Sequence, residues 1–336
     1  MSIINDLKAR AKALKMTIVL PESHDERTLR AAQIIVNESI SDVILLGDPE
    51  KILADAGALG LDLSQCKIID PLTSQLTRDF SEAFYQKRKD KGTSPEQALA
   101  CTQNPLYFGA MLVNKGLAQG MVAGAANTTA DVLRAALQVV GVKPGLKTVS
   151  STFIMVSPRT EDPALMFADC AVVPCPTDEQ LADIATSTAE TRRLILSDEP
   201  FVALLSFSTK GSAEHELVSK VQSAKAILDA RSVDFAYDGE LQLDAAIVPR
   251  IAASKAKNSP VAGMANTLIF PDLQAGNIGY KLVQRLGNYE AIGPIIQGLA
   301  APICDLSRGC SVDDIVNTAV LVLLMAQNLT ILKRRI

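Results

Sequence analysis

A hydroxyl, a guanidinium and a carboxylate fall within eight positions near the end of the chain, in the stretch CDLSRGCSVDD. They belong to Ser307, Arg308 and Asp314. Ser311 followed by Asp314 matches a capping box, so we expect a helix to begin here and to present free backbone N–H groups. Because a cation at a helix N-terminus opposes the macrodipole, Arg308 in this place favours a bound anion such as phosphate.

The same stretch has a purely structural interpretation. Asp314 would only cap the helix, Ser307 would lie in a turn, and Arg308 would be a solvated surface side chain. Short motifs match by chance, so these residues alone do not decide between the two interpretations.

Three further stretches have the residue types that bind anions. In NTTADVLRAALQVVG, Thr128 and Asp131 match a second capping box, and Arg134 lies one turn inside the expected helix, after small residues that resemble an anion cradle. The motifs GxGxxG and GxxxxGK followed by Ser or Thr are both missing, so neither a dinucleotide site nor a P-loop is supported. The loop STKGS, 208–212, either binds an anion or makes a tight turn. A basic cluster ends the segment SEAFYQKRKDK and is either solvated or a patch for a polyanion; it consists of Lys87, Arg88, Lys89 and Lys91.

Length and composition are those of a globular protein with two domains. The 336 residues exceed the size at which one core stops growing, and a net charge of −4 argues against a nucleic-acid surface. Two histidines and six cysteines without a CxxC pair give no ligand set for zinc. The longest apolar run, 319–326, is too short to span a membrane. Because no signal peptide is apparent, we expect a cytoplasmic protein with reduced thiols.

Alternating strand and helix patterns predict the scaffold that positions these residues. We expect buried strands in MTIVLPES, DVILLGD and KIIDP, with helices between them. Ser23 and Glu26 match another capping box, which predicts a helix that follows Ser23. This alternation implies an α/β fold in which helices cover both faces of a parallel sheet. The turn-rich segment GVKPG, 141–145, is the best domain boundary, and further strands are predicted beyond it in KTVSSTFIMVS, ALMFADCAVV and PFVALLSF.

Long ordered blocks cover the chain from this candidate cradle to the last helix: NTTADVLRAALQVVGVKPG, FADCAVVPCPT, LLSFSTKGSA, DGELQLDAAIVP, FPDLQAGNIGYKLVQRLG and GPIIQGLAAPICDLSRGCSVDDIV. Through these blocks the chain resembles the phosphate acetyltransferase (phosphotransacetylase) family in its short catalytic form. The resemblance implies a two-domain α/β fold with mainly parallel sheets flanked by helices, similar to isocitrate and isopropylmalate dehydrogenases, with the active site in the interdomain cleft. It also implies that residues 1–145 plus 298–336 form the first domain and 146–297 the second.

The family's reaction is acetyl-CoA + phosphate = acetyl phosphate + CoA. The resemblance assigns Asp314 as the general base for the CoA thiol, Ser307 as a donor to the developing oxyanion, and Arg308 as the group that holds the phosphoryl oxygens. A base is required because a free thiol has a pKa of about 8.5 and only its thiolate is a strong nucleophile. The thiolate would attack the acetyl carbonyl directly in a ternary complex. However, a helix N-terminus and a nearby arginine both stabilise a carboxylate, which would weaken Asp314 as a base. The sequence therefore leaves three roles open for Asp314: general base, group that orients the thiol, and group that stabilises charge.

Substrate binding is implied for four more residues: Arg88, Arg134, Thr129 and Lys281. The phosphates of CoA are the natural anions for the two arginines. The resemblance further implies that CoA is a substrate, that no cofactor or metal is tightly bound, and that the protein is a homodimer. Its partners would be small molecules, with neither nucleic acid nor a membrane among them.

Three other functions are compatible with parts of the sequence. Another acyl-CoA:phosphate transferase, such as a butyryltransferase, would keep the anion-binding residues and have a wider acyl pocket. A metal- and nicotinamide-dependent decarboxylating dehydrogenase would need clustered carboxylates, of which the sequence shows no convincing set. A scaffold without catalysis is disfavoured because Ser307, Arg308 and Asp314 are all present.

Overall fold

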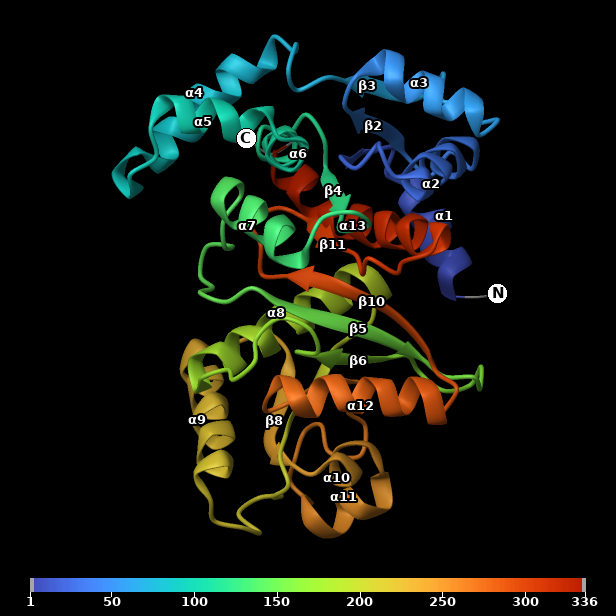
Figure 1. The fold of residues 1–336 in the computed structure, drawn as a ribbon. Coiled ribbons are helices and arrows are strands. Elements are labelled where there is room, and N and C mark those ends of the chain that lie inside the picture. The colour runs from blue at the N-terminus through green and yellow to red at the C-terminus, as the bar shows by residue number, and fades with distance from the viewer. Residues whose placement is uncertain (1–2, 334–336) are drawn as a thin grey trace. The chain divides into compact units, whose positions relative to one another are not determined.

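The computed structural model describes residues 3–333, and the chain forms two compact units. Unit 1 consists of Met1–Lys143 together with Leu299–Ile336, and unit 2 is Pro144–Gly298. Each unit is an α/β layer structure with helices on both faces of its sheet (Figure 1). Among the described helices, none combines enough length with enough apolar character to cross a bilayer.

The sheet of unit 1 has five strands, all parallel, in the order β11-β4-β1-β2-β3. The strands are β1 (Thr17–Leu20), β2 (Asp42–Leu46), β3 (Lys67–Ile69), β4 (Gly120–Ala123) and β11 (Ile303–Asp305). Strands β1, β2 and β4 are nearly continuous apolar runs, as expected where helices cover both faces of a parallel sheet. The prediction of an α/β fold is therefore confirmed, and three of these strands are those predicted from the first 70 residues.

Eight α-helices surround this sheet within the described part of the chain, with a short 3-10 turn at Lys89–Lys91. They are α1 (Ile3–Ala13), α2 (Glu26–Asn37), α3 (Pro49–Ala58), α4 (Leu76–Arg88), α5 (Pro95–Gln103), α6 (Pro105–Asn114), α7 (Thr129–Val139) and α13 (Val312–Lys333). Helices α4 to α7 share one buried core with the strands, whereas α1, α2 and α13 pack together and α13 also contacts β4. The last helix of the chain therefore completes the first unit.

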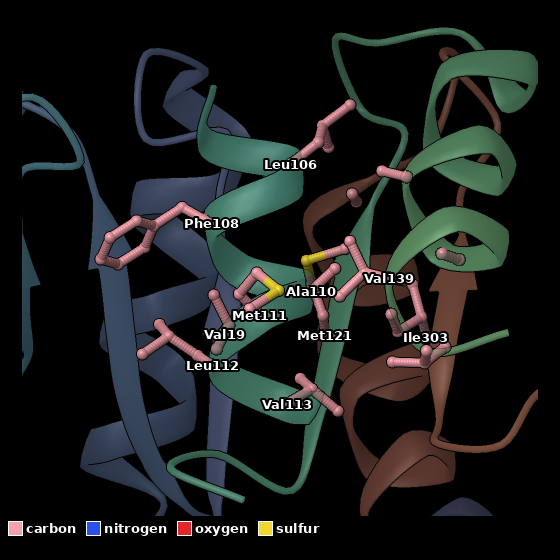
Figure 2. Packing of buried hydrophobic residues seen from close by; sticks show 14 of the residues in the cluster. Val19, Leu106, Phe108, Ala110, Met111, Leu112, Val113, Met121, Val139 and Ile303 are labelled. Atoms are coloured by element: carbon pink, nitrogen blue, oxygen red, sulfur yellow. The ribbon is translucent and has the colours of Figure 1, made fainter. Parts of the chain in front are cut away.

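Helix α6 packs directly on the sheet. Phe108 and Met111 pack with Val19 of β1 and Met121 of β4 (Figure 2). Gly109 allows this close approach, because a Cβ at that position would lie 2.6 Å from the Met121 sulfur. Substitution of Gly109 by alanine would therefore force the end of the Met121 side chain to shift.

Helix α2 begins later than its sequence pattern predicted. The predicted Ser23–Glu26 capping box is wrong: the N-cap is Asp25, whose carboxylate accepts a hydrogen bond from the Arg27 N–H. Ser23 is buried, and its hydroxyl both donates to the Leu46 carbonyl (2.9 Å) and accepts from the Leu46 N–H (3.1 Å). Its hydroxyl is thus used to join the ends of β1 and β2, which leaves Asp25 to cap the helix.

Unit 2 contains a six-stranded sheet in the order β10-β5-β6-β9-β7-β8. Strand β5 is antiparallel to both its neighbours, and the other pairs are parallel. Helices α8 and α9 cover one face and α10 and α12 pack on the other. The elements are β5 (Ser150–Val156), β6 (Leu165–Ala168), α8 (Asp178–Leu196), β7 (Phe201–Leu205), α9 (Glu216–Arg231), β8 (Ala236–Leu241), α10 (Leu243–Ile247), α11 (Pro249–Lys255), β9 (Thr267–Ile269), α12 (Leu273–Leu286) and β10 (Glu290–Gln297).

Candidate functional site

The loop between β11 and α13 presents the first set of candidate residues. Ser307, Arg308 and Gly309 are exposed, and the guanidinium of Arg308 has no hydrogen bond or ion pair with any residue that the structure describes. A turn closes this loop, since the Cys310 N–H donates to the Ser307 carbonyl (2.9 Å) and the Gly309 N–H to the Ser307 hydroxyl oxygen (3.3 Å). The loop therefore offers a hydroxyl and a free cation to an anionic ligand.

The predicted capping box at the start of α13 is confirmed. The Ser311 N–H donates to Asp314 Oδ2 (2.8 Å), and the Asp314 N–H donates to the Ser311 hydroxyl (3.1 Å). Both side chains are exposed. Asp314 therefore has the structural role that the sequence predicted, and its second carboxylate oxygen is left for other partners.

Arg27 holds this loop in place, although nothing in the sequence singled it out. Its Nη1 donates to the carbonyls of Arg308 and Cys310, both at 2.8 Å, and its Nη2 donates to the Ala125 carbonyl (2.7 Å). Its remaining N–H groups bind the Asp25 carboxylate at 3.0 and 2.7 Å, which lowers the pKa of Asp25. All five donors of the guanidinium are thus used within the protein. Arg27 fixes the backbone on both sides of Gly309.

The loop between β4 and α7, expected to be an anion cradle, already holds an anion from the protein itself. The carboxylate of Glu22, buried at the end of β1, accepts five hydrogen bonds of 2.7 to 3.2 Å, four from the backbone N–H groups of 124–127 and one from the Asn127 side chain. The N–H groups of this loop are therefore not available to phosphate. The sequence pattern correctly identified an anion-binding loop, but its ligand is internal.

The helix that follows this loop begins with a hydroxyl that reaches back to the sheet. Thr128 caps α7 as predicted, since its hydroxyl accepts the Asp131 N–H (3.1 Å), whereas the Asp131 carboxylate accepts from the Thr128 hydroxyl (2.6 Å) rather than from its N–H. Thr129, the first residue of α7, is exposed, and its hydroxyl donates to Oδ2 of Asp305 (2.6 Å). Burial raises the pKa of Asp305 to about 6, although the hydrogen bond from Thr129 opposes this rise. Asp305 was not among the predicted site residues.

Arg134 and Arg88 lie in the same part of unit 1. Arg134 is exposed on α7 and pairs with Asp131 at 2.7 Å. Arg88, half-buried, ends α4, and its Nε is buried without a partner among the described residues. Burial raises the pKa of Tyr107 on α6, and the positive charges of Arg134 and Arg88 both oppose that rise. The charges of the two arginines therefore both act on one tyrosine.

Lys281 belongs to α12 of unit 2, unlike the other six predicted residues. It is exposed, and its Nζ lies 5.8 Å from the centre of the Tyr280 ring.

The loop 208–212 in unit 2 is a turn closed by another internal carboxylate. Glu240 is buried and accepts from the Gly211 N–H (2.7 Å) and the Ser208 hydroxyl (3.0 Å). Of the two interpretations that the sequence allowed for this loop, the structure supports the tight turn.

The residues that the sequence interpretation missed have one signal in common. Glu22 and Asp305 are acidic residues at the carboxyl ends of strands that both pair with β4. Ligand and catalytic groups of parallel α/β sheets gather at this edge. An acidic residue that directly follows a buried strand is therefore a candidate for the site even without a local motif.

Comparisons with known proteins give one family. A family model described as "Phosphate acetyl/butaryl transferase" matches residues 2–323. A phosphate acetyltransferase of Thermoanaerobacterium thermosaccharolyticum is 52% identical over 330 residues, which is 97% of this chain and 100% of that protein.

Solved structures agree with this similarity. The crystal structure of a phosphotransacetylase from Streptococcus pyogenes is 45% identical, with a TM-score of 0.93 over 97% of this chain and 98% of that one. A structure from Salmonella typhimurium, described as a 4-hydroxythreonine-4-phosphate dehydrogenase, is 9% identical with a TM-score of 0.56 over 93% of this chain and 99% of that one. The second likeness concerns the fold alone, and it agrees with the predicted similarity to dehydrogenases.

Proposed function

The chain belongs to the phosphate acetyl/butaryl transferase family, and on that premise we propose that it transfers an acetyl group reversibly between coenzyme A and inorganic phosphate. The reaction is acetyl-CoA + phosphate = acetyl phosphate + CoA. The observation that carries this proposal is the guanidinium of Arg308, exposed and without a partner among the described residues, on a loop that Arg27 fixes by its backbone. A planar guanidinium on a rigid loop suits bidentate binding of a phosphoryl group.

The chemistry is a direct transfer within a ternary complex. The CoA thiol loses its proton, the thiolate forms a C–S bond to the acetyl carbonyl, and the C–O bond to phosphate breaks. The leaving phosphate takes up one proton, so that protons and charge balance. Arg308 holds the phosphoryl oxygens, and the Ser307 hydroxyl donates to the oxyanion that develops on the carbonyl.

We assign Asp314 the role of orienting the thiol. Its Oδ2 already accepts the Ser311 N–H at the start of α13, so this capping contact holds the carboxylate in place. Its remaining oxygen can accept a hydrogen bond from the thiol. This is one of the three roles that the sequence left open.

Arg88, Arg134 and Lys281 bind the phosphates of CoA, and Thr129 contacts the same substrate. CoA enters as a substrate, and the reaction needs no bound cofactor or metal. The ion pair between Arg134 and Asp131 is exposed, so exchanging this partner for a phosphate costs little.

The protein acts in the cytoplasm as a homodimer. None of the six cysteines, all of which lie in the described part of the chain, forms a disulfide, which is typical of a reducing compartment. On α12, Ile278, Leu282 and Leu286 are 57%, 52% and 79% exposed and follow at intervals of four residues. Such an apolar stripe suits an antiparallel pair with the same helix of a second copy. Substitution Leu282→Glu should yield a monomer in light scattering after gel filtration, and an unchanged mass in solution would contradict the pairing.

The activity is tested by mixing pure protein with CoA and acetyl phosphate and following the thioester absorbance. We expect CoA-dependent formation of acetyl-CoA, and acetyl phosphate should react faster than propionyl or butyryl phosphate. A butyryl preference would make the protein a butyryltransferase instead, and the absence of any thioester would overturn the proposal.

Arg308→Ala should lower kcat/KM for acetyl phosphate by about 100-fold or more, because a charged donor to the transferring group is removed. Arg308→Lys should recover only part of this loss, since an ammonium cannot form two parallel hydrogen bonds. The affinity for CoA should change little, which equilibrium titration with CoA measures. Unchanged kinetics of the alanine variant would remove the phosphate role.

A further inference from the structure

Asp305 is a buried carboxyl group with very few partners. It is 3% exposed, and its Oδ2 accepts one hydrogen bond, from the Thr129 hydroxyl. Its Oδ1 is buried and has no donor among the described residues. Buried polar atoms are nearly always hydrogen-bonded, so a buried acceptor without a donor needs an explanation.

No cation compensates this carboxylate among the residues that the structure describes. Arg27 uses all its donors elsewhere, Arg134 pairs with Asp131 on α7, and the charge of Glu22 raises the pKa of Asp305 further. On α13, Asp313 and Asp314 are exposed and carry the same sign of charge. The ionised form is therefore poorly stabilised, and burial raises the pKa of this group to about 6.

Thr129 connects the buried carboxyl to the surface. A hydroxyl has one proton, and in the structure this proton points to Asp305. While Asp305 is ionised, the Thr129 oxygen can therefore only accept a hydrogen bond from a further partner. Such an oxygen repels a phosphate and attracts a group that carries a hydrogen, such as a thiol.

We propose that Asp305 and Thr129 form a proton relay that receives the proton of the CoA thiol, an inference that rests on the proposed function. The S–H bond breaks as the proton moves to the Thr129 oxygen, and the former hydroxyl proton moves to Oδ2 of Asp305. One neutral thiol and one carboxylate become one thiolate and one carboxylic acid, so charge is conserved. Once the thiolate has attacked, sulfur and the leaving oxygen are bound to the same carbon. The proton returns through Thr129 to the leaving phosphate, and Asp305 is a carboxylate again.

The relay explains why the two carboxyl groups near the reactive loop differ. A base is most effective when its affinity for a proton is matched to the pH at which it works. The buried Asp305 meets this condition because little stabilises its ionised form, whereas the exposed Asp314 is already occupied by its capping contact with Ser311. Asp305 acts through Thr129 and is a positioning residue in this scheme, whereas Thr129 touches the substrate.

The test is the pH dependence of kcat/KM for CoA in the direction of acetyl-CoA synthesis, between about pH 5 and pH 8. The wild-type value should fall on the acid side with a midpoint at about pH 6. Asp305→Asn and Thr129→Val should each lower kcat/KM about 100-fold. Both substitutions should also remove the decrease of kcat/KM at acid pH, which is the acid limb of the profile. The double variant should be no slower than either single variant, because the two residues serve one proton path. The substrates ionise identically in every assay, so a limb that disappears belongs to the enzyme.

Two controls keep the result interpretable. Thr129→Ser retains the hydroxyl and should keep the activity within a few-fold together with the acid limb. Asp48→Asn changes an exposed helix cap in the same unit and should leave the profile unaltered. A Thr129→Val or Asp305→Asn enzyme with the wild-type limb, or additive losses in the double variant, would overturn the relay. A wild-type protein that makes no acetyl-CoA would overturn the proposed function itself, before any variant is compared.

Discussion

Glu22 and Asp305 are both buried carboxyl groups at the ends of strands that pair with β4, yet their surroundings are opposite. Glu22 accepts five hydrogen bonds and joins β1 to the loop that leads into α7. Asp305 accepts one, from a hydroxyl that is itself exposed. All the hydrogen bonds of the Glu22 carboxylate serve to hold the loop 124–127 in place. The Asp305 carboxylate has a single donor among the described residues and can change its protonation state.

This contrast shows how one sheet edge serves two purposes. A carboxylate with many N–H donors serves as a fixed acceptor that holds the backbone of a loop. A buried carboxylate with one donor destabilises the folded state at neutral pH, which proteins tolerate mainly at functional sites. The number of donors, rather than burial, therefore separates the structural group from the reactive one.

The largest effect on stability is expected from Glu22→Gln. The amide nitrogen would face N–H groups of the loop 124–127, and at least two charge-assisted bonds would be lost at about 1.5 kcal/mol or more each. The free energy of unfolding, measured in urea, should fall by about 3 kcal/mol. Glu26→Gln removes a carboxylate from an exposed pair with Arg30 and should cost about 0.5 kcal/mol or less. Equal losses in the two variants would contradict the structural role of Glu22.

Asp305→Asn should act in the opposite direction at neutral pH. Because the pKa of Asp305 is raised from 3.8 to about 6 in the folded state, its ionisation opposes folding. This penalty is absent below about pH 4, grows as the pH rises through about 6, and is complete above that. At about 1.4 kcal/mol for each pKa unit, the variant should be up to about 3 kcal/mol more stable than wild type at neutral pH.

Urea titrations of wild type and variant at pH values on both sides of this window measure the difference directly. The two proteins should have equal stability in acid and diverge above it. A variant that is less stable than wild type at neutral pH would show that Asp305 stabilises the fold, and would break the contrast with Glu22.

The exposed carboxyl of Asp314 provides an intermediate case. Ser311→Ala removes one half of the capping box and should cost about 1 kcal/mol of unfolding free energy with only a few-fold loss of activity. Asp314→Ala should cost a similar amount of stability and a much larger part of kcat. If both variants lose activity equally, Asp314 serves the helix alone and orients no substrate.

The smallest change in stability is expected at Arg134. Its pair with Asp131 is exposed on both sides, so Arg134→Ala should alter the unfolding free energy by about 0.5 kcal/mol or less. The KM for CoA should nevertheless rise, because a cation that binds its phosphates is lost. Asp131→Asn is the matched control and should leave that KM unchanged or lower it. A rise of the KM for CoA in both variants would show that the effect comes from a change in α7 rather than from the loss of the Arg134 cation.

Local patterns predicted a large part of this structure. Buried strands, the α/β alternation, the N-cap at Thr128 and the capping box at Ser311 depend on residues a few positions apart, so they can be predicted from local patterns. The exposed Ser307 and Arg308 were also identified in this way. The prediction failed at Ser23, where the competing partner, Leu46, lies 23 residues away in the chain.

The features that the sequence did not reveal depend on much longer separations. Glu22 is 102 residues from the first N–H that it binds, and Asp305 is 176 residues from Thr129. No periodicity or motif connects such positions. The loop 124–127 was therefore interpreted as a site for an external anion, because its internal one lies on another strand.

The order of the chain has a consequence for biosynthesis. Unit 2 is continuous in sequence, whereas the sheet of unit 1 lacks β11 and its covering helix α13 until residues 303–333 have left the ribosome. Until then β4 has an open edge, and Thr129 has no carboxylate to which it can donate. The nascent chain therefore exposes an unpaired strand over a long period of synthesis, which makes this edge the place where misassembly would begin.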